Sequence, residues 1–112
     1  MNTFIPGSLH DVNFENFEAI VDGQKAVILD FWADWCQPCK AFAPIYAEVA
    51  SLHPEIYFGK VNTEVAKDLA EAFLVRSIPT VMAFKNGELI FEQAGVPGPA
   101  QLESLISSLL AP

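Results

Sequence analysis

The amino-acid sequence predicts an α/β protein built around a mixed sheet. Helical and strand patterns alternate through most of the chain, which favours parallel strands joined by helical crossovers. Asn86-Gly87 lies between two apolar runs, and this pair is the strongest short-range signal for a β-hairpin. An amphipathic helix then closes the chain. The hairpin therefore adds an antiparallel edge to a sheet that is otherwise parallel.

The first two elements are an amphipathic helix and a buried strand. Phe14 and Phe17 lie at helical spacing, and Asn13 precedes them as a residue that favours the N-cap position. Residues 25–33 form a continuous apolar run rich in β-branched and aromatic side chains. Such a run is typical of a central strand that is buried on both faces.

A second helix is predicted from Pro38 to Leu52, because apolar residues recur there at helical spacing. Its predicted apolar face consists of Phe42, Ile45, Val49 and Leu52. The sequence IYFGKV, residues 56–61, then predicts a second strand. The helix would connect the two strands as a crossover.

Two further helices complete the pattern. Residues 64–75, EVAKDLAEAFLV, place Val65, Leu69 and Phe73 on one helical face. Near the C-terminus, Gly98-Pro99 marks a helix start, since proline suits the first helical position. The apolar face of this last helix is predicted to comprise Leu102, Leu105, Ile106 and Leu109.

Length and composition predict one globular domain, residues 1–112. Apolar residues make up 52% of the chain and charged residues 18%, a balance that allows a packed core. The net charge of −8 argues against a nucleic-acid partner or an anionic membrane surface. No run approaches the ~18 apolar residues that a membrane-spanning helix needs.

The N-terminal sequence MNTFIPGSLHDV has neither a basic start nor an apolar signal core. We therefore expect no secretion signal and a cytoplasmic location, where thiols are kept reduced. We also expect a monomer.

The only two cysteines, Cys36 and Cys39, lie in the stretch LDFWADWCQPCK at a strand-to-helix junction. At the helix N-terminus, free N–H groups and the helix dipole would stabilise a thiolate on Cys36. Cys39 would lie one turn later on the same face, close enough to attack a mixed disulfide formed on Cys36. Pro38 suits the first turn and stiffens the loop between them. This pattern predicts a dithiol that reduces disulfides of other proteins.

Zinc binding, a cysteine–histidine nucleophile and two inert buried thiols are the alternatives. A zinc site wants four ligands, and the only other soft candidates are His10 and His53. His53 would lie about 21 Å beyond Cys39 along a continuous helix, so neither a zinc site nor a nucleophile pair can use it. A nucleophile pair would need His10 to approach. The junction and the expected exposure beside two tryptophans favour redox chemistry over inert thiols.

Asp30 stands inside the apolar strand, six residues before Cys36. A carboxyl group buried there stays protonated to unusually high pH. Its predicted role is to accept the proton of Cys39, through water, during disulfide exchange. The alternative is an aspartate that reaches solvent at a strand end. Lys60, in the next strand, is positioned to pair with it.

At these residues the chain resembles the thioredoxin family, over nearly its whole length. The resemblance rests on DFWADWCQPCK, on RSIPT, on FKNGE and on the glycine that follows the hairpin, Gly95. It implies a thioredoxin fold, a mixed central sheet of about five strands flanked by four helices. It also implies Cys36 as the nucleophile, Cys39 as the resolving thiol, Asp30 as the buried carboxylate and Lys60 as its neighbour.

The resemblance further implies where substrates dock. A cis peptide bond between Ile78 and Pro79 would face the cysteines. Trp35, these two residues and Gly95 would form a shallow apolar groove for the substrate backbone. Trp32 is expected to pack against the active-site loop rather than to contact substrate.

The implied activity is protein-disulfide reduction without a cofactor, with a thioredoxin reductase and disulfide-containing proteins as partners. Gln37 stands where the family usually has glycine, so it is the residue expected to affect redox tuning. Several stretches look closest to the second bacterial type, whose N-terminal zinc module this sequence lacks, so no metal is expected. A binding module or chaperone subunit with incidental thiols, and a thiol oxidase or isomerase, are the alternative functions.

Overall fold

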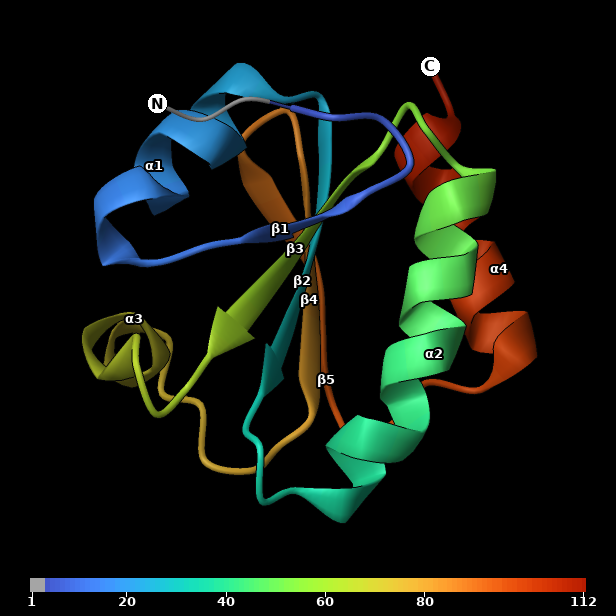
Figure 1. Ribbon diagram of the computed structural model, residues 1–112. Coiled ribbons are helices and arrows are strands. Elements are labelled where there is room, and N and C mark those ends of the chain that lie inside the picture. Colours follow the sequence, from blue (N-terminus) through green and yellow to red (C-terminus); the bar gives the residue numbers. More distant parts are fainter. Residues whose placement is uncertain (1–3) are drawn as a thin grey trace.

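A five-stranded sheet runs through the middle of the molecule, with helices on both faces (Figure 1). The computed structural model describes residues 4–112, so the predicted domain 1–112 begins at residues outside the described part. The strands are β1 (Leu9–Asp11), β2 (Ala26–Trp32), β3 (Tyr57–Asn62), β4 (Thr80–Lys85) and β5 (Glu88–Ala94). The helices are α1 (Phe14–Gly23), α2 (Gln37–Leu52), α3 (Lys67–Ala72) and α4 (Pro99–Leu110).

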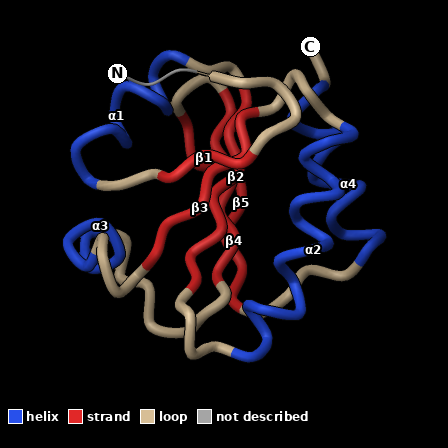
Figure 2. The backbone as a smooth tube through the Cα atoms, viewed as in Figure 1, coloured by secondary structure: helices blue, strands red, loops and turns tan. Residues whose placement is uncertain are grey.

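The sheet is mixed, as predicted. Its strand order is β1-β3-β2-β4-β5, with β3 parallel to both β1 and β2. β4 runs antiparallel to β2 and β5 antiparallel to β4, so the hairpin forms one edge (Figure 2). The sheet and helices also match the architecture that the family resemblance implies.

Helices α1 and α3 cover one face of the sheet, and α2 and α4 cover the other (Figure 1). Each pair of helices closes a separate apolar core. Strand β2 lies between the two cores, and its residues from Ala26 to Phe31 are all buried. The continuous apolar run was therefore a correct signal for a central strand.

Local signals placed two further features correctly. Asn13 caps α1: its side chain accepts a hydrogen bond from the Asn16 N–H, and the Asn16 side chain accepts one from the Asn13 N–H. Asn86 and Gly87 form the hairpin turn with φ of 52° and 82°, the left-handed values that favour Asn-Gly.

The predicted apolar face of α2 was wrong in part. Ile45 and Leu52 are 48% and 66% exposed, whereas the buried stripe starts at the active-site cysteine and continues along the helix. That stripe consists of Cys39, Phe42, Tyr46 and Ala50. The buried side of α2 is the one that carries Cys39, so Tyr46 and Ala50 are buried where Ile45 and Leu52 were expected.

The predicted helix over residues 64–75 was too long. Helix α3 has six residues, and Val65, expected on its apolar face, is exposed. The amides of Val65 and Ala66 both donate to the Asn62 carbonyl and form a turn after β3 instead of a helix. At the other end, Leu74 takes a positive φ of 56°, which a continuing helix does not allow.

Strand β1 was not predicted from residue patterns, because it has only three residues and includes His10 and Asp11. It becomes a strand through parallel pairing with β3. In the part of the chain that the structure covers, no helix has the length and apolar character needed to cross a membrane.

Candidate active site

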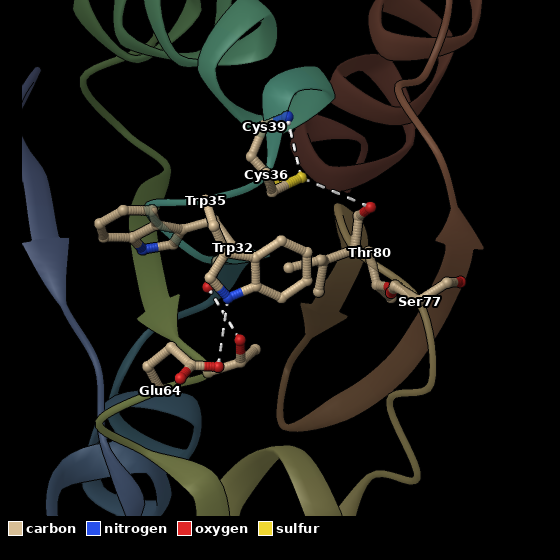
Figure 3. Close-up of a disulfide and its surroundings, with 9 residues drawn as sticks. Trp32, Trp35, Cys36, Cys39, Glu64, Ser77 and Thr80 are labelled. Carbon is tan, nitrogen blue, oxygen red and sulfur yellow. Dashed lines mark hydrogen bonds between the residues drawn. A yellow bond between two sulfur atoms is a disulfide. The ribbon is translucent and has the colours of Figure 1, made fainter.

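The two cysteines form a disulfide at the start of α2, just beyond the end of β2 (Figure 3). Cys36 is the N-cap of α2, and its Sγ accepts a hydrogen bond from the Cys39 N–H at 3.2 Å. Pro38 lies in the first turn of α2, where backbone N–H groups have no partner within the helix, so its lack of an N–H removes no hydrogen bond. The Cα atoms of the pair are 5.2 Å apart, within the range that a disulfide spans.

The expected exposure of the cysteines was wrong for this oxidised form. Cys36 is 4% exposed and Cys39 is 3% exposed. The sulfur of Cys36 is covered from the opposite side by the loop that precedes β4, where the Ile78 carbonyl oxygen lies 3.6 Å from it. The position of Cys36 at the helix cap, rather than exposure, is what separates this pair from inert thiols.

The segments of the implied docking groove come together beside the disulfide. The peptide bond between Ile78 and Pro79 is cis, as the family resemblance implied. The Gly95 N–H donates to the Pro79 carbonyl at 2.7 Å, which joins the loop after β5 to the loop before β4. Gly95 has a φ of 91°, a conformation that side-chain-bearing residues rarely adopt.

Trp35 is a strongly exposed part of this site, with 66% of its surface accessible. Its indole N–H points to the carboxylate of Glu64, with a distance of 3.4 Å from Nε1 to Oε2 (Figure 3). Gln37, the first residue of α2, is also exposed. An aromatic ring and an amide side chain therefore border the disulfide on the solvent side.

Asp30 is buried in β2, at 1% exposure, so the alternative of a solvated strand end is wrong. Within residues 4–112 neither carboxyl oxygen has a hydrogen-bond partner. Burial raises the pKa of Asp30 from 3.8 to about 7, and the positive charge of Lys60 opposes this rise. A carboxyl group with such a pKa can hold or release a proton at neutral pH.

Lys60 lies beside Asp30 in the sheet register, but its ammonium group lies over an aromatic ring instead. Its Nζ atom lies 4.4 Å from the centre of the Trp32 ring, a cation–π arrangement. The Trp32 Nε1 is buried and has no partner among the described residues. The Trp32 side chain is thus partly buried, with Lys60 over its ring.

Tyr46 is a residue of this region that the sequence analysis missed. It is fully buried on the sheet-facing side of α2, seven residues after Cys39. Its hydroxyl lies 3.0 Å from the Ile28 carbonyl oxygen and 2.8 Å from that of Gly59. Burial, followed by the charge of Asp30, holds the pKa of Tyr46 well above its usual value. A helical stripe drawn from Cys39 through Phe42 would have predicted its burial.

The histidines lie away from the disulfide chemistry. His10 stacks on Tyr57 with ring centres 4.5 Å apart, and its Nε2 accepts a hydrogen bond from the Ile5 N–H. His53 follows the far end of α2. Across residues 4–112, no group of three or more His, Cys, Asp and Glu side chains is placed to hold a metal ion.

Two cysteines on a helix N-terminus, a covering loop with a cis-proline and a buried carboxyl group define a thiol–disulfide oxidoreductase. The chain belongs to the thioredoxin family: the family model described as Thioredoxin matches residues 8–110.

Known proteins of this family are similar over most of their length. A Streptomyces coelicolor protein whose name includes thioredoxin 2 is 44% identical over 92 residues, which cover 82% of this chain and 69% of that protein. Thioredoxin f of spinach chloroplast has a TM-score of 0.87 and 30% identity, covering 99% of this chain and 100% of that one. A thioredoxin f2 solved in complex with ferredoxin:thioredoxin reductase has a TM-score of 0.84 and 28% identity, over 95% and 98% of the two chains.

Proposed function

We propose that this member of the family works as a protein-disulfide reductase, with Cys36 as the attacking thiol. The observation that carries the proposal is the disulfide at the start of α2, in which the Cys39 N–H donates to Cys36 Sγ. An N–H donor and the positive end of a helix favour a thiolate at that sulfur. The thiolate is the form that attacks a disulfide.

The reaction proceeds in two exchanges. The Cys36 thiolate attacks one sulfur of the substrate disulfide, whose S–S bond breaks, and the released thiolate takes up a proton. Cys39 then loses its proton and attacks Cys36 Sγ, which breaks the mixed disulfide and releases the second substrate thiolate. Two electrons pass to the substrate, and the Cys36–Cys39 disulfide remains on the protein.

Asp30 accepts the proton that Cys39 loses in the second exchange, through water. Both groups are buried, and both lie between the sheet and α2, because Asp30 shares a sheet face with Ile28, which packs in the core beneath α2. A pKa of about 7 suits an acceptor that must also return the proton in the next cycle.

Substrate docks on the groove formed by Trp35, Ile78, Pro79 and Gly95. The tryptophan supplies exposed apolar area, and the two loops supply main-chain groups next to the disulfide. An exposed groove of this kind suits an extended stretch of a partner protein better than a small molecule.

A thioredoxin reductase regenerates the dithiol. The similarity to a thioredoxin f2 solved with its reductase supports a partner of this kind. We propose that the protein acts as a monomer in the cytoplasm, where a reducing thiol pool suits a reductase. Size-exclusion chromatography and cell fractionation test these two points.

An insulin-reduction assay tests the proposed function. The wild type should reduce insulin disulfides with dithiothreitol as the electron source, and Cys36→Ser should abolish the activity. Cys39→Ser should instead trap a mixed disulfide with the substrate. In the reduced protein, iodoacetamide should label Cys36 first. A wild type without activity would contradict the proposed function and favour a binding module. First labelling of Cys39 would instead reverse the roles assigned to the two cysteines.

A further inference from the structure

Thr80 is a buried polar residue next to the active site to which the mechanism above gives no role. It is the first residue of β4, and its hydroxyl donates to the Ser77 carbonyl at 2.5 Å (Figure 3). This bond closes the loop that leads into β4. Serine at this position would keep the bond, and valine would keep the shape but lose it.

The Ile78 carbonyl lies between two carbonyls that are held in place. On one side the Ser77 carbonyl is held by Thr80, and on the other the Pro79 carbonyl is held by a main-chain N–H at 2.7 Å. The oxygen of Ile78 itself points to the active site, 3.6 Å from Cys36 Sγ. The two flanking bonds thus restrain the segment that carries the Ile78 carbonyl oxygen.

The sulfur of Cys36 therefore has two polar neighbours with opposite effects. The Cys39 N–H, at 3.2 Å, donates a hydrogen bond and favours the thiolate. The Ile78 carbonyl oxygen, 3.6 Å from this sulfur in the disulfide form, can only accept a hydrogen bond. In the reduced protein it would therefore favour the protonated thiol, whose S–H can donate to it. Moving the carbonyl away would leave the N–H donor unopposed.

We propose that Thr80 is a positioning residue for the reductase reaction: its hydroxyl holds the Ile78 carbonyl oxygen against Cys36 Sγ and so limits ionisation of the attacking thiol. The proposal rests on the proposed function only in taking Cys36 as that thiol. A thiolate becomes a weaker nucleophile as its thiol becomes more acidic. Limiting the ionisation of Cys36 would therefore keep its thiolate more reactive.

Alkylation of the reduced protein by iodoacetamide over a range of pH tests the proposal. The rate at Cys36, followed by peptide mapping, reports its thiolate fraction. On the acid limb of the profile, Thr80→Val should react about two- to fivefold faster than the wild type, the effect of losing one weak S–H···O bond. Thr80→Ser should restore the wild-type profile, because it restores the hydroxyl.

Thr63→Val is the matched control. The Thr63 hydroxyl also donates to a main-chain carbonyl near the site, that of Trp32, at 3.1 Å. The Thr63 N–H continues to donate to the same oxygen, so the loop keeps an anchor after the substitution. The other ionisable side chains described at this site, Cys39, Asp30, Lys60 and Glu64, are unchanged in all variants. The control should follow the wild-type profile.

An unchanged or slower acid limb in Thr80→Val would overturn the proposal, as would equal acceleration in Thr80→Ser. If Thr80→Val does not fold, the proposal can be tested on the wild type by following backbone carbonyl ¹³C chemical shifts as the pH is changed. The Ile78 carbonyl shift should follow the titration of Cys36, and the Ser77 carbonyl should respond less; a silent Ile78 carbonyl would reject the idea. These measurements need no substrate, so failure of the insulin assay would count only against the proposed function.

Discussion

Asp30 and Lys60 occupy matching positions on β2 and β3, yet the Lys60 ammonium group lies over the Trp32 ring. Within the described chain, both oxygens of Asp30 stay without a hydrogen bond. The lysine therefore acts on the carboxyl group through its charge and not through a hydrogen bond. Two side chains of β2, Asp30 and Trp32, thus share the positive charge of Lys60 on β3.

Replacing Lys60 should raise the pKa of Asp30. In Lys60→Met the stem of the side chain remains but the positive charge is lost, so the pKa should move above its present value of about 7. Titration of the Asp30 carboxyl carbon by NMR measures it directly. Lys25→Met is the control, since Lys25 precedes the opposite end of β2. A pKa that falls in Lys60→Met would show that Lys60 does not stabilise the carboxylate.

The buried carboxyl group of Asp30 should make folding less stable as the pH rises. Its pKa is about 7 when folded and near 3.8 when unfolded, so between these values the folded state binds more protons. Stability is full below pH 4, falls by about 1.4 kcal/mol per pH unit between about pH 4 and pH 7, and is about 4 kcal/mol lower above pH 7. Urea unfolding at pH 5 and pH 8 should show about 2–3 kcal/mol of this fall.

Asp30→Asn isolates this effect, because asparagine keeps the shape and cannot ionise. At pH 8 the variant should be about 1–3 kcal/mol more stable than the wild type, with the burial of the amide offsetting part of the gain. At pH 5 the two proteins should differ little. Insulin reduction should slow at the step where Cys39 loses its proton. If Asp30→Asn were less stable than the wild type at pH 8, the ionised carboxylate of Asp30 would not be destabilising, contrary to its burial in the core.

Tyr46→Phe should destabilise the protein by about 1–3 kcal/mol, because the Ile28 and Gly59 carbonyls lose their buried donor. Tyr57→Phe is the control: in the described residues its hydroxyl makes no recorded hydrogen bond, so the loss should stay below about 0.5 kcal/mol. Urea unfolding of both variants at one pH checks the pair. Equal losses would mean that the hydroxyl of Tyr46 contributes nothing specific.

Gln37→Gly should change the reduction potential by less than about 30 mV. Glutamine is the better helix former by about 0.5–1 kcal/mol. Gln37 is exposed at the first position of α2, and its helix preference acts on the dithiol and the disulfide alike, so most of it should cancel. A glutathione redox titration of both proteins measures the shift. A change beyond about 60 mV would mean that Gln37 stabilises one redox state and would favour an oxidase or isomerase.

The sequence predicted features that depend on local patterns. The apolar run of β2 and the Asn-Gly turn specify a central strand and a hairpin wherever they occur. The burial of Asp30 followed from its place inside the run. The face of α2 was harder, since Ile45 and Leu52 are as apolar as the buried residues, and only docking on the sheet decides which stripe is covered.

Contacts between segments far apart in the chain could not be predicted from the sequence. The position of Lys60 over Trp32 depends on side-chain torsions, and the hydroxyl of Tyr46 meets carbonyls on two strands that only the fold brings together. The same holds for the approach of the Ile78 carbonyl to Cys36, which are 42 residues apart. The resemblance to a family supplied the groove residues that residue patterns alone did not connect.

The place of β2 in the sheet also governs how the molecule opens. This strand pairs with β3 on one side and β4 on the other, whereas β1 and β5 each have one neighbour. Amide protons of edge strands exchange with solvent through local openings, and those of a strand enclosed on all sides exchange only when the whole domain unfolds. Asp30 lies within β2, and Cys36 follows a few residues beyond its end. The edges can therefore fray without separating the cysteine pair from Asp30.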